Sequence, residues 1–138
     1  MTSTTFPAAP SRAGVVGYWV CTGLVAANLA LGGVWDMLRT EYVRGVIEHL
    51  GYPVYFLVIL GFWKLPGAVV VLAPGLPRLK EWVYAGAVFT YTGAVTSHLA
   101  VGDGTGETLP AAIMSGLAIA SWGLRPPSRR SPPACRAD

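Results

Sequence analysis

Charged residues are scarce in this 138-residue chain, at 12%, whereas hydrophobic residues make up 53% and the mean hydropathy is +0.50. Soluble domains usually devote about a quarter of their residues to charge. The charges that do occur lie between long apolar runs instead of being spread along the chain. This composition predicts a protein that resides in a lipid bilayer, and it provides no folded basic surface for nucleic-acid binding.

Cysteine and histidine are also rare, with two of each. Cys21 falls within an apolar run and Cys135 near the C-terminus, so they form no CxxC pair and exclude a dithiol quinone reductase. His49 and His98 form no ligand pair with the usual spacing of a zinc site, and the sequence has no glycine-rich phosphate loop or GxSxG elbow. We therefore predict no intrinsic cofactor and no metal, so that redox chemistry would depend on a quinone or a partner subunit.

Long apolar runs dominate what is present. A membrane-spanning helix needs about 20 mostly apolar residues, and the candidate stretches are residues 14–35, 53–73, 82–101 and the shorter 108–124. The first is too long for a signal-peptide core and lacks a small-x-small cleavage site, so we expect it to remain as a helix. The prediction is an all-α four-transmembrane-helix bundle over residues 14–124, with disordered tails over 1–13 and over the basic, proline-rich 125–138.

The positions of the basic residues predict the orientation of this bundle. They lie before the first stretch, between the second and third, and after the fourth: Arg12, Arg78, Lys80, Arg125, Arg129, Arg130 and Arg136. Because lysine and arginine favour the cytoplasmic side, we expect a multi-pass plasma-membrane protein with both termini cytoplasmic.

The connection between the first two stretches has an amphipathic pattern. Its apolar residues share one helical face, with charged residues opposite: Tyr42, Val43, Val46, Ile47 and Leu50 against Glu41, Arg44 and Glu48. This pattern predicts a short helix lying in the membrane interface and ending at Gly51. Such a helix could act as a lid over a cavity or could simply fill the connection.

Lys64 lies near the middle of the second stretch. An ionisable group at the centre of a bilayer costs about 2.5 to 3.5 kcal/mol, so it usually faces a polar interior or a functional pathway. With a rise of about 1.5 Å per residue, Tyr91 lies at a similar depth. We expect an outward-opening cavity with Lys64 at its floor, with the entrance formed by other polar residues, namely Asn28, Asp36, His98, Glu48 and His49.

Small residues recur at helical spacing in the last two stretches: Gly86, Thr90, Gly93 and Ser97, then Ala112, Gly116, Ala120 and Gly123. Such stripes let neighbouring backbones approach closely in membranes. They predict a tight bundle and would by themselves suffice for a scaffold.

Several motifs resemble one known family. They are His49-Leu-Gly-Tyr-Pro, Leu60-Gly-Phe-Trp-Lys-Leu-Pro-Gly, Leu72-Ala-Pro-Gly-Leu-Pro-Arg-Leu-Lys-Glu-Trp and Thr92-Gly-Ala-Val-Thr-Ser-His-Leu-Ala-Val-Gly-Asp. Together they resemble the DoxX-like family of small four-helix bacterial membrane proteins, over about residues 14–124. The resemblance implies a four-helix fold and, since the family is named after a subunit of a thiosulfate:quinone oxidoreductase, a link to membrane redox chemistry. It carries over Lys64, His98 and Asp103, and more loosely His49 and Glu81.

These observations predict a small component of a membrane redox process that binds a quinone or similar lipophile. The expected partners are the bilayer, the lipophile, and either a redox subunit or a second copy of the chain. The catalytic candidates are Lys64 as polar anchor, His98 as proton carrier or hydrogen-bond donor, and Asp103 at the mouth of the cavity. The ligand-binding candidates are Asn28, Asp36, Glu48, His49, Trp63, Tyr91 and Ser97. The alternatives are a stand-alone isomerase, cyclase or hydratase acting on a terpenoid-like substrate, for which a desolvated lysine could serve as acid, base or nucleophile, and a scaffold without chemistry.

Overall fold

The computed structural model describes residues 11–130, and within that range the chain is all-helical, without a strand. Its elements are α1 (Arg12–Leu38), α2 (Glu41–His49), α3 (Tyr55–Leu72), α4 (Pro77–Ala100), α5 (Thr105–Gly123) and the short 3-10 helix η1 (Pro127–Arg129). The all-α prediction is confirmed, and a short helix occurs where the amphipathic pattern predicts one. Of the described helices, α1 and α3 have both the length and the hydropathy needed to cross a membrane.

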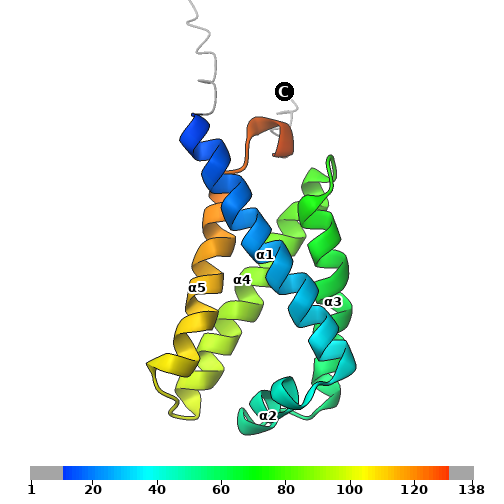
Figure 1. Ribbon diagram of the computed structural model, residues 1–138, viewed down its shortest axis with the longest axis vertical. Helices are drawn as coiled ribbons and strands as arrows, with labels where there is room; N and C mark the ends of the chain where they lie inside the picture. The colour runs from blue at the N-terminus through cyan, green and yellow to red at the C-terminus, as the bar shows by residue number, and fades with distance from the viewer. Residues whose placement is uncertain (1–10, 131–138) are drawn as a thin grey trace, which may run out of the picture.

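The long helices form a bundle in which α1 runs diagonally across the others (Figure 1). α1 packs mainly against α3 and α5, and α4 packs mainly against α5, whereas α3 and α4 touch each other little. The start of α1 and η1 lie at one end of the bundle, and α2 lies at the other end with the α4–α5 connection (Figure 1). The sparse packing of α3 against α4 therefore leaves the bundle open along one side.

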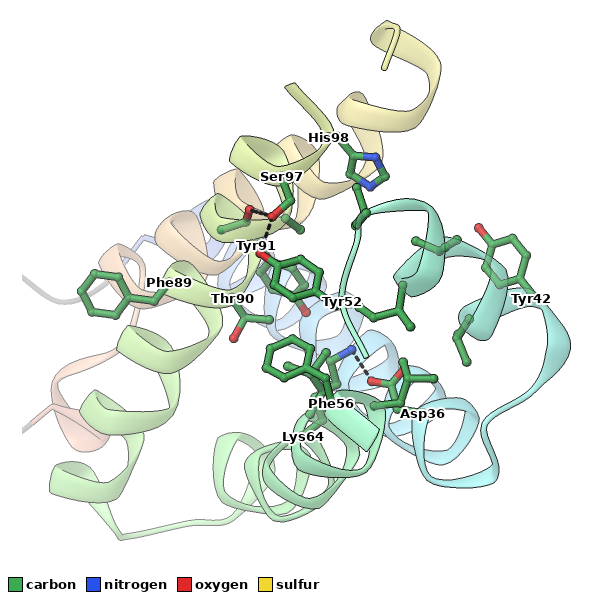
Figure 2. Close-up of a pocket in the computed structure, with 18 residues that line it drawn as sticks. Asp36, Tyr42, Tyr52, Phe56, Lys64, Phe89, Thr90, Tyr91, Ser97 and His98 are labelled. Carbon is green, nitrogen blue, oxygen red and sulfur yellow. Dashed lines mark hydrogen bonds and ion pairs between the residues drawn. The ribbon is translucent and has the colours of Figure 1, made fainter. Parts of the chain in front are cut away.

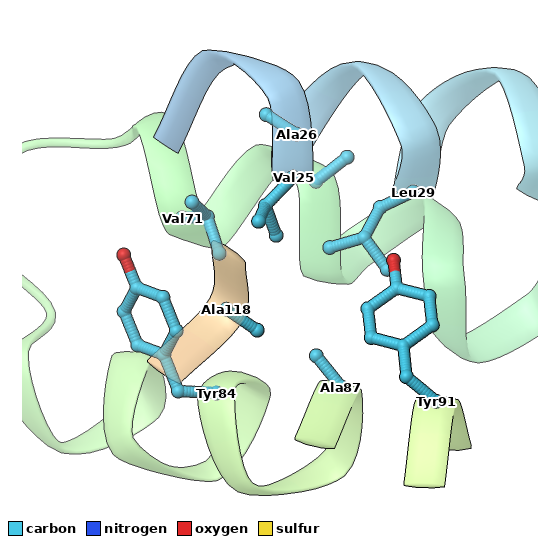
Figure 3. Packing of buried hydrophobic residues seen from close by; sticks show 9 residues of the cluster. Val25, Ala26, Leu29, Val71, Tyr84, Ala87, Tyr91 and Ala118 are labelled. Atoms are coloured by element: carbon cyan, nitrogen blue, oxygen red, sulfur yellow. The ribbon is translucent and has the colours of Figure 1, made fainter. Parts of the chain in front are cut away.

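Two tyrosines of α4, Tyr84 and Tyr91, flank the hydrophobic core (Figure 3). The buried residues between them come from all the long helices: Val25, Ala26 and Leu29 of α1, Ala68 and Val71 of α3, Ala87 of α4 and Ala118 of α5. The Tyr84 hydroxyl shares a 2.7 Å hydrogen bond with Ser121, which shares another of 2.7 Å with Thr22. Because buried hydroxyls need partners, this chain of hydrogen bonds lets α1, α4 and α5 pack together without an unpaired Tyr84.

The closest helix approach joins α1 and α3 at two glycines. A β-carbon added at Gly61 would lie 2.8 Å from the carbonyl oxygen of Gly33, so only glycine fits there. Added β-carbons at Gly86, Gly93 and Gly116 would meet nothing within 4 Å. The predicted stripes in α4 and α5 are therefore not where the helices approach most closely.

The helix ends differ in places from the predicted spans. α1 begins at Arg12, where the Ser11 hydroxyl accepts a 3.1 Å hydrogen bond from the Gly14 amide and caps the helix. It continues to Leu38 and ends at Arg39, which adopts a left-handed conformation with φ of 50°. α1 therefore includes residues assigned to the N-terminal tail and extends beyond its predicted outer end.

The predicted C-terminal tail starts with packed residues. Arg125 is 3% exposed and donates to Glu81 at 2.6 Å, while its backbone oxygen accepts from Arg130 at 2.7 Å. The prediction of a disordered tail from residue 125 is therefore corrected for residues 125–130. Residues 1–10 and 131–138, including Cys135, lie outside the described residues.

Lys80, one of the basic residues that predicted the orientation, is fully buried. Its amine donates to the carbonyl oxygens of Val70, Val71 and Ala73, all within 2.9 Å. The last carbonyls of a helix have no partners within the helix. Lys80 of α4 therefore caps the C-terminal end of α3.

Candidate functional site

A cavity of about 480 Å³, here called the first cavity, lies among α2, α3 and α4, with one wall supplied by α1 (Figure 2). Most of its lining is apolar or aromatic: Tyr42, Val43, Val46, Ile47, Leu50, Tyr52, Phe56, Leu57, Leu60, Phe89, Tyr91, Gly93 and Ala94. The remaining lining residues are polar: Asp36, Lys64, Thr90, Ser97 and His98. An apolar cavity with a few polar groups is the usual form of a small-molecule site.

The strongest polar feature of the first cavity is an ion pair. Lys64 Nζ donates to Asp36 Oδ2 at 2.7 Å, and the two side chains are 18% and 5% exposed. The prediction placed Asp36 near the entrance; because α1 continues to Leu38, Asp36 instead sits in the last helical turn and faces inward beside Lys64. In Figure 2 this pair lies at the opposite end of the cavity from His98.

Glycines make room for this pair. A β-carbon added at Gly33 would lie 3.1 Å from Lys64 Cβ, and one added at Gly32 would lie 3.6 Å from Lys64 Nζ. Lys64 therefore leaves α3 beside Gly33 and runs along α1 past Gly32 to reach Asp36. The close approach of the two helices places the amine against the carboxylate.

Tyr91 lines the first cavity with its ring, but its hydroxyl has a protein partner. It donates to Asn28 Oδ1 at 2.7 Å. The predicted depths of Tyr91 and Lys64 in the membrane suggested that the two side chains could meet. In the structure, the Tyr91 hydroxyl instead contacts α1 through Asn28. Asn28 does not line the first cavity, so its predicted place near the entrance is corrected.

Three predicted residues meet beside the end of α2. Asp103 Oδ2 accepts from His98 Nδ1 and Asp103 Oδ1 accepts from His49 Nε2, each at 2.6 Å. The hydrogen bond from His98, followed by that from His49, lowers the pKa of Asp103 below its ordinary value. Nearby, Tyr52 and Ser97 hydroxyls share a 2.9 Å hydrogen bond. These contacts tie α2 and the segment after it to the C-terminal end of α4.

Two of the other candidates lie elsewhere. Glu48 is on the exposed face of α2, where Arg44 is its 3.9 Å ion-pair partner, and it does not line either described cavity. Trp63 does not line the first cavity. It lines a second cavity of about 490 Å³ between α3 and α4.

The second cavity continues along the open side of the bundle. Its lining residues are Leu29, Ile59, Leu60, Trp63, Lys64, Pro66, Gly67, Val70, Leu79, Trp82, Val83, Gly86, Ala87, Thr90 and Tyr91. The two cavities share a wall made of Leu60, Lys64, Thr90 and Tyr91. Over residues 11–130, no group of at least three histidine, cysteine, aspartate or glutamate residues is arranged to hold a metal ion.

An all-α bundle with two helices apolar enough to cross a membrane and a buried ion pair beside an apolar cavity defines a class of small, membrane-associated helical proteins. The chain belongs to the DoxX-like family, whose sequence profile matches residues 20–121. The family resemblance is thereby confirmed, and the matched range contains every candidate site residue. No curated protein and no solved structure matches the chain.

Proposed function

We propose that this DoxX-like protein crosses the bacterial plasma membrane four times, through α1, α3, α4 and α5, with both termini cytoplasmic. Large apolar side chains support contact with lipid: Trp82 is 80% and Phe89 77% exposed, whereas soluble proteins rarely expose large contiguous apolar surfaces. Residues 12 and 127–129 lie at the same end of the bundle (Figure 1), as an even number of crossings requires.

The proposed function is binding of a quinone or similar lipophile in the first cavity, as a small component of a membrane redox process. The observation that carries this proposal is the lysine at the cavity wall. A lysine amine has three N–H donors, and within the described residues the hydrogen bond of Lys64 goes to Asp36. The donors left over can bind a quinone carbonyl, while Phe56 and Leu60 contact the apolar ring.

Quinone reduction needs electrons and protons in equal number. A redox partner subunit would supply the electrons. His98 lines the first cavity and is hydrogen-bonded to Asp103, so this pair would transfer protons between the cavity and the outer surface. Asp36 would act as a positioning residue, because it holds Lys64 against the cavity wall.

The test is quinone binding to the purified protein in lipid nanodiscs, with a tailless ubiquinone ring as probe. Gly93 lines the first cavity and a β-carbon there meets nothing within 4 Å, so the side chain of Gly93→Leu begins in open space and should occupy part of the cavity. Gly116→Leu on α5 is the matched control, because Gly116 is equally unhindered and lines neither cavity. We expect Gly93→Leu and Lys64→Met to lose ring binding and Gly116→Leu to retain it.

Other results would favour the alternatives. If a terpenoid hydrocarbon without a carbonyl bound as well as the ring and was converted by the protein alone, a stand-alone enzyme would be the better account. If neither probe bound and Gly93→Leu left complexes with partner proteins intact, the chain would be a scaffold. Equal ring binding by Gly93→Leu and Gly116→Leu would contradict the proposed site.

A further inference from the structure

We propose that the second cavity holds the linear hydrocarbon tail of a ligand whose polar head occupies the first cavity. The ligand class is then a single-tailed amphiphile with a hydrogen-bonding ring, instead of a compact terpenoid. This inference rests on the proposed function, because it places the ligand's head beside Lys64.

Continuity between the cavities supports one elongated ligand. They meet at a common wall that includes Lys64, Thr90 and Tyr91. A ring that binds Lys64 from the first cavity would therefore have its substituent at the entrance of the second. α3 and α4 pack little against each other, so few helix contacts lie between the two spaces beyond the side chains of this common wall.

The first cavity is the more polar of the two, which suits the polar head of the ligand, and the second is the more apolar, which suits its hydrocarbon tail. The first cavity contains the Asp36–Lys64 pair, Ser97 and His98. The polar side chains of the second cavity are two indoles and the residues of the common wall. The rest of its lining is apolar and includes Ile59, Val70, Leu79 and Val83. Hydrocarbon placed against this apolar part of the lining covers no polar side chain.

The shape of the second cavity also fits a chain. On α3 its lining continues from Lys64 to Val70, which spans roughly 9 Å at 1.5 Å per residue. Trp63 and Trp82, which are 69% and 80% exposed, contribute to its lining. The tail would therefore run from Lys64 toward the α3–α4 connection and remain partly in contact with lipid.

The glycine of α4 in this region gives a selective way to close the second cavity. Gly86 lines the second cavity and a β-carbon there would meet nothing within 4 Å, so a leucine side chain begins in open space and should occupy part of the cavity. Leucine also favours helix over glycine by about 0.8 kcal/mol or more. Gly86→Leu should therefore fold, and Gly116→Leu again provides the matched control.

The experiment uses the full chain in nanodiscs and a ubiquinone ring with a decyl tail ending in a photoactivatable diazirine. A phosphatidylcholine with a diazirine in its acyl chain reports labelling by bulk lipid. We expect the tailed ring to label the second-cavity part of α4, Leu79 to Gly86. Tailless ring present at ten times its dissociation constant should reduce this labelling about tenfold by mass action. Gly86→Leu should abolish the labelling and retain tailless-ring binding, whereas Gly116→Leu should behave as wild type.

The contrary results separate this inference from the proposed function. Labelling that tailless ring does not compete, or that equals the phosphatidylcholine pattern, would show that bulk lipid fills the second cavity. A dimer in native mass spectra that Gly86→Leu dissociates would assign the cavity to a second copy of the chain. Either result, obtained with intact ring binding, would overturn the tail site and leave the proposed function standing. Failure of the tailless ring to bind wild-type protein would overturn both.

Discussion

The carbonyl oxygen of Gly33 would lie 2.8 Å from a β-carbon at Gly61, so α1 and α3 meet backbone to backbone. Lys64 follows Gly61 by three residues and Asp36 follows Gly33 by three. In an α-helix, residues three apart lie on nearly the same face. The close approach of the two glycines therefore also determines where the ion pair forms.

Substitution of Gly61 by alanine should destabilise the bundle. The new β-carbon would lie 2.7 Å from Met37 Cγ and 2.8 Å from the Gly33 oxygen, and the backbone cannot move aside as a side-chain end can. Overpacking of this kind costs about 1 to 3 kcal/mol. Gly116→Ala is the control, since its β-carbon meets nothing within 4 Å. Denaturant unfolding in detergent micelles measures the difference, and equal stability of the two variants would contradict the close approach.

Removal of one partner of the Asp36–Lys64 pair should cost more than removal of both. Both side chains are largely buried, and an ionised group left there without a partner typically costs about 3 to 5 kcal/mol. We expect Asp36→Asn and Lys64→Met each to lower the free energy of unfolding, and the double variant to lose less than the sum. A double-mutant cycle makes the measurement. Strict additivity would show that the two residues do not interact.

Acid should weaken the contacts of Asp103. Its pKa is lowered from an ordinary value of 3.8 by the hydrogen bonds from His98 and His49. A carboxyl with a lowered folded-state pKa stabilises the fold above its unfolded-state pKa, and this stabilisation is lost as pH falls through the folded-state value. Wild type should therefore unfold at a higher temperature than Asp103→Asn at about pH 5, and the difference should close as the pH falls below 3.8.

The matched control for the acid experiment is Glu48→Gln on the exposed face of α2. Its 3.9 Å ion pair with Arg44 is solvent-exposed, and such pairs contribute little to stability. A pH-independent difference between wild type and Asp103→Asn would contradict a stabilising role for the ionised carboxylate.

Loss of the Lys80 amine should unfold the end of α3. Lys80→Met leaves the carbonyl oxygens of Val70, Val71 and Ala73 without this donor, and each buried unpaired group costs about 1 to 3 kcal/mol. Arg78→Met, at an exposed position in the same helical turn, is the control. Hydrogen exchange should rise over residues 68–73 in Lys80→Met alone. Unchanged protection there would show that the caps are dispensable.

Sequence patterns predicted the parts of this fold that depend on residue type along one helix. The lengths of the apolar stretches predicted the long helices. The amphipathic pattern around Val46 and Ile47 predicted α2. A lysine in an apolar membrane segment is energetically costly, and this cost made Lys64 a candidate. Lys64 lines both cavities. The motif at the end of the third stretch drew attention to His98 and Asp103, which are hydrogen-bonded.

Relationships between helices were not predictable in the same way. Asp36 was placed near the entrance because the end of α1 was set too early, and a shift of one turn decides whether this carboxylate faces water or Lys64. Lys80 served only to predict orientation, and its capping role could not be predicted because its partners are backbone oxygens, which every sequence has at every position. The small-residue stripes of α4 and α5 did not predict the closest helix contact. Small residues permit a close approach, but the crossing geometry decides which of them make it, here Gly33 and Gly61.

Both ends of α2 are marked by residues in left-handed conformation, Arg39 with φ of 50° and Gly51 with φ of 81°. The packing of α1 on α3 is set by glycines and an ion pair that lie outside the segment between these residues. That segment is therefore a separable module: changes to its length and sequence should alter the shape of one cavity wall without shifting the register of α1 on α3. In protein engineering it is the natural place to graft a different specificity.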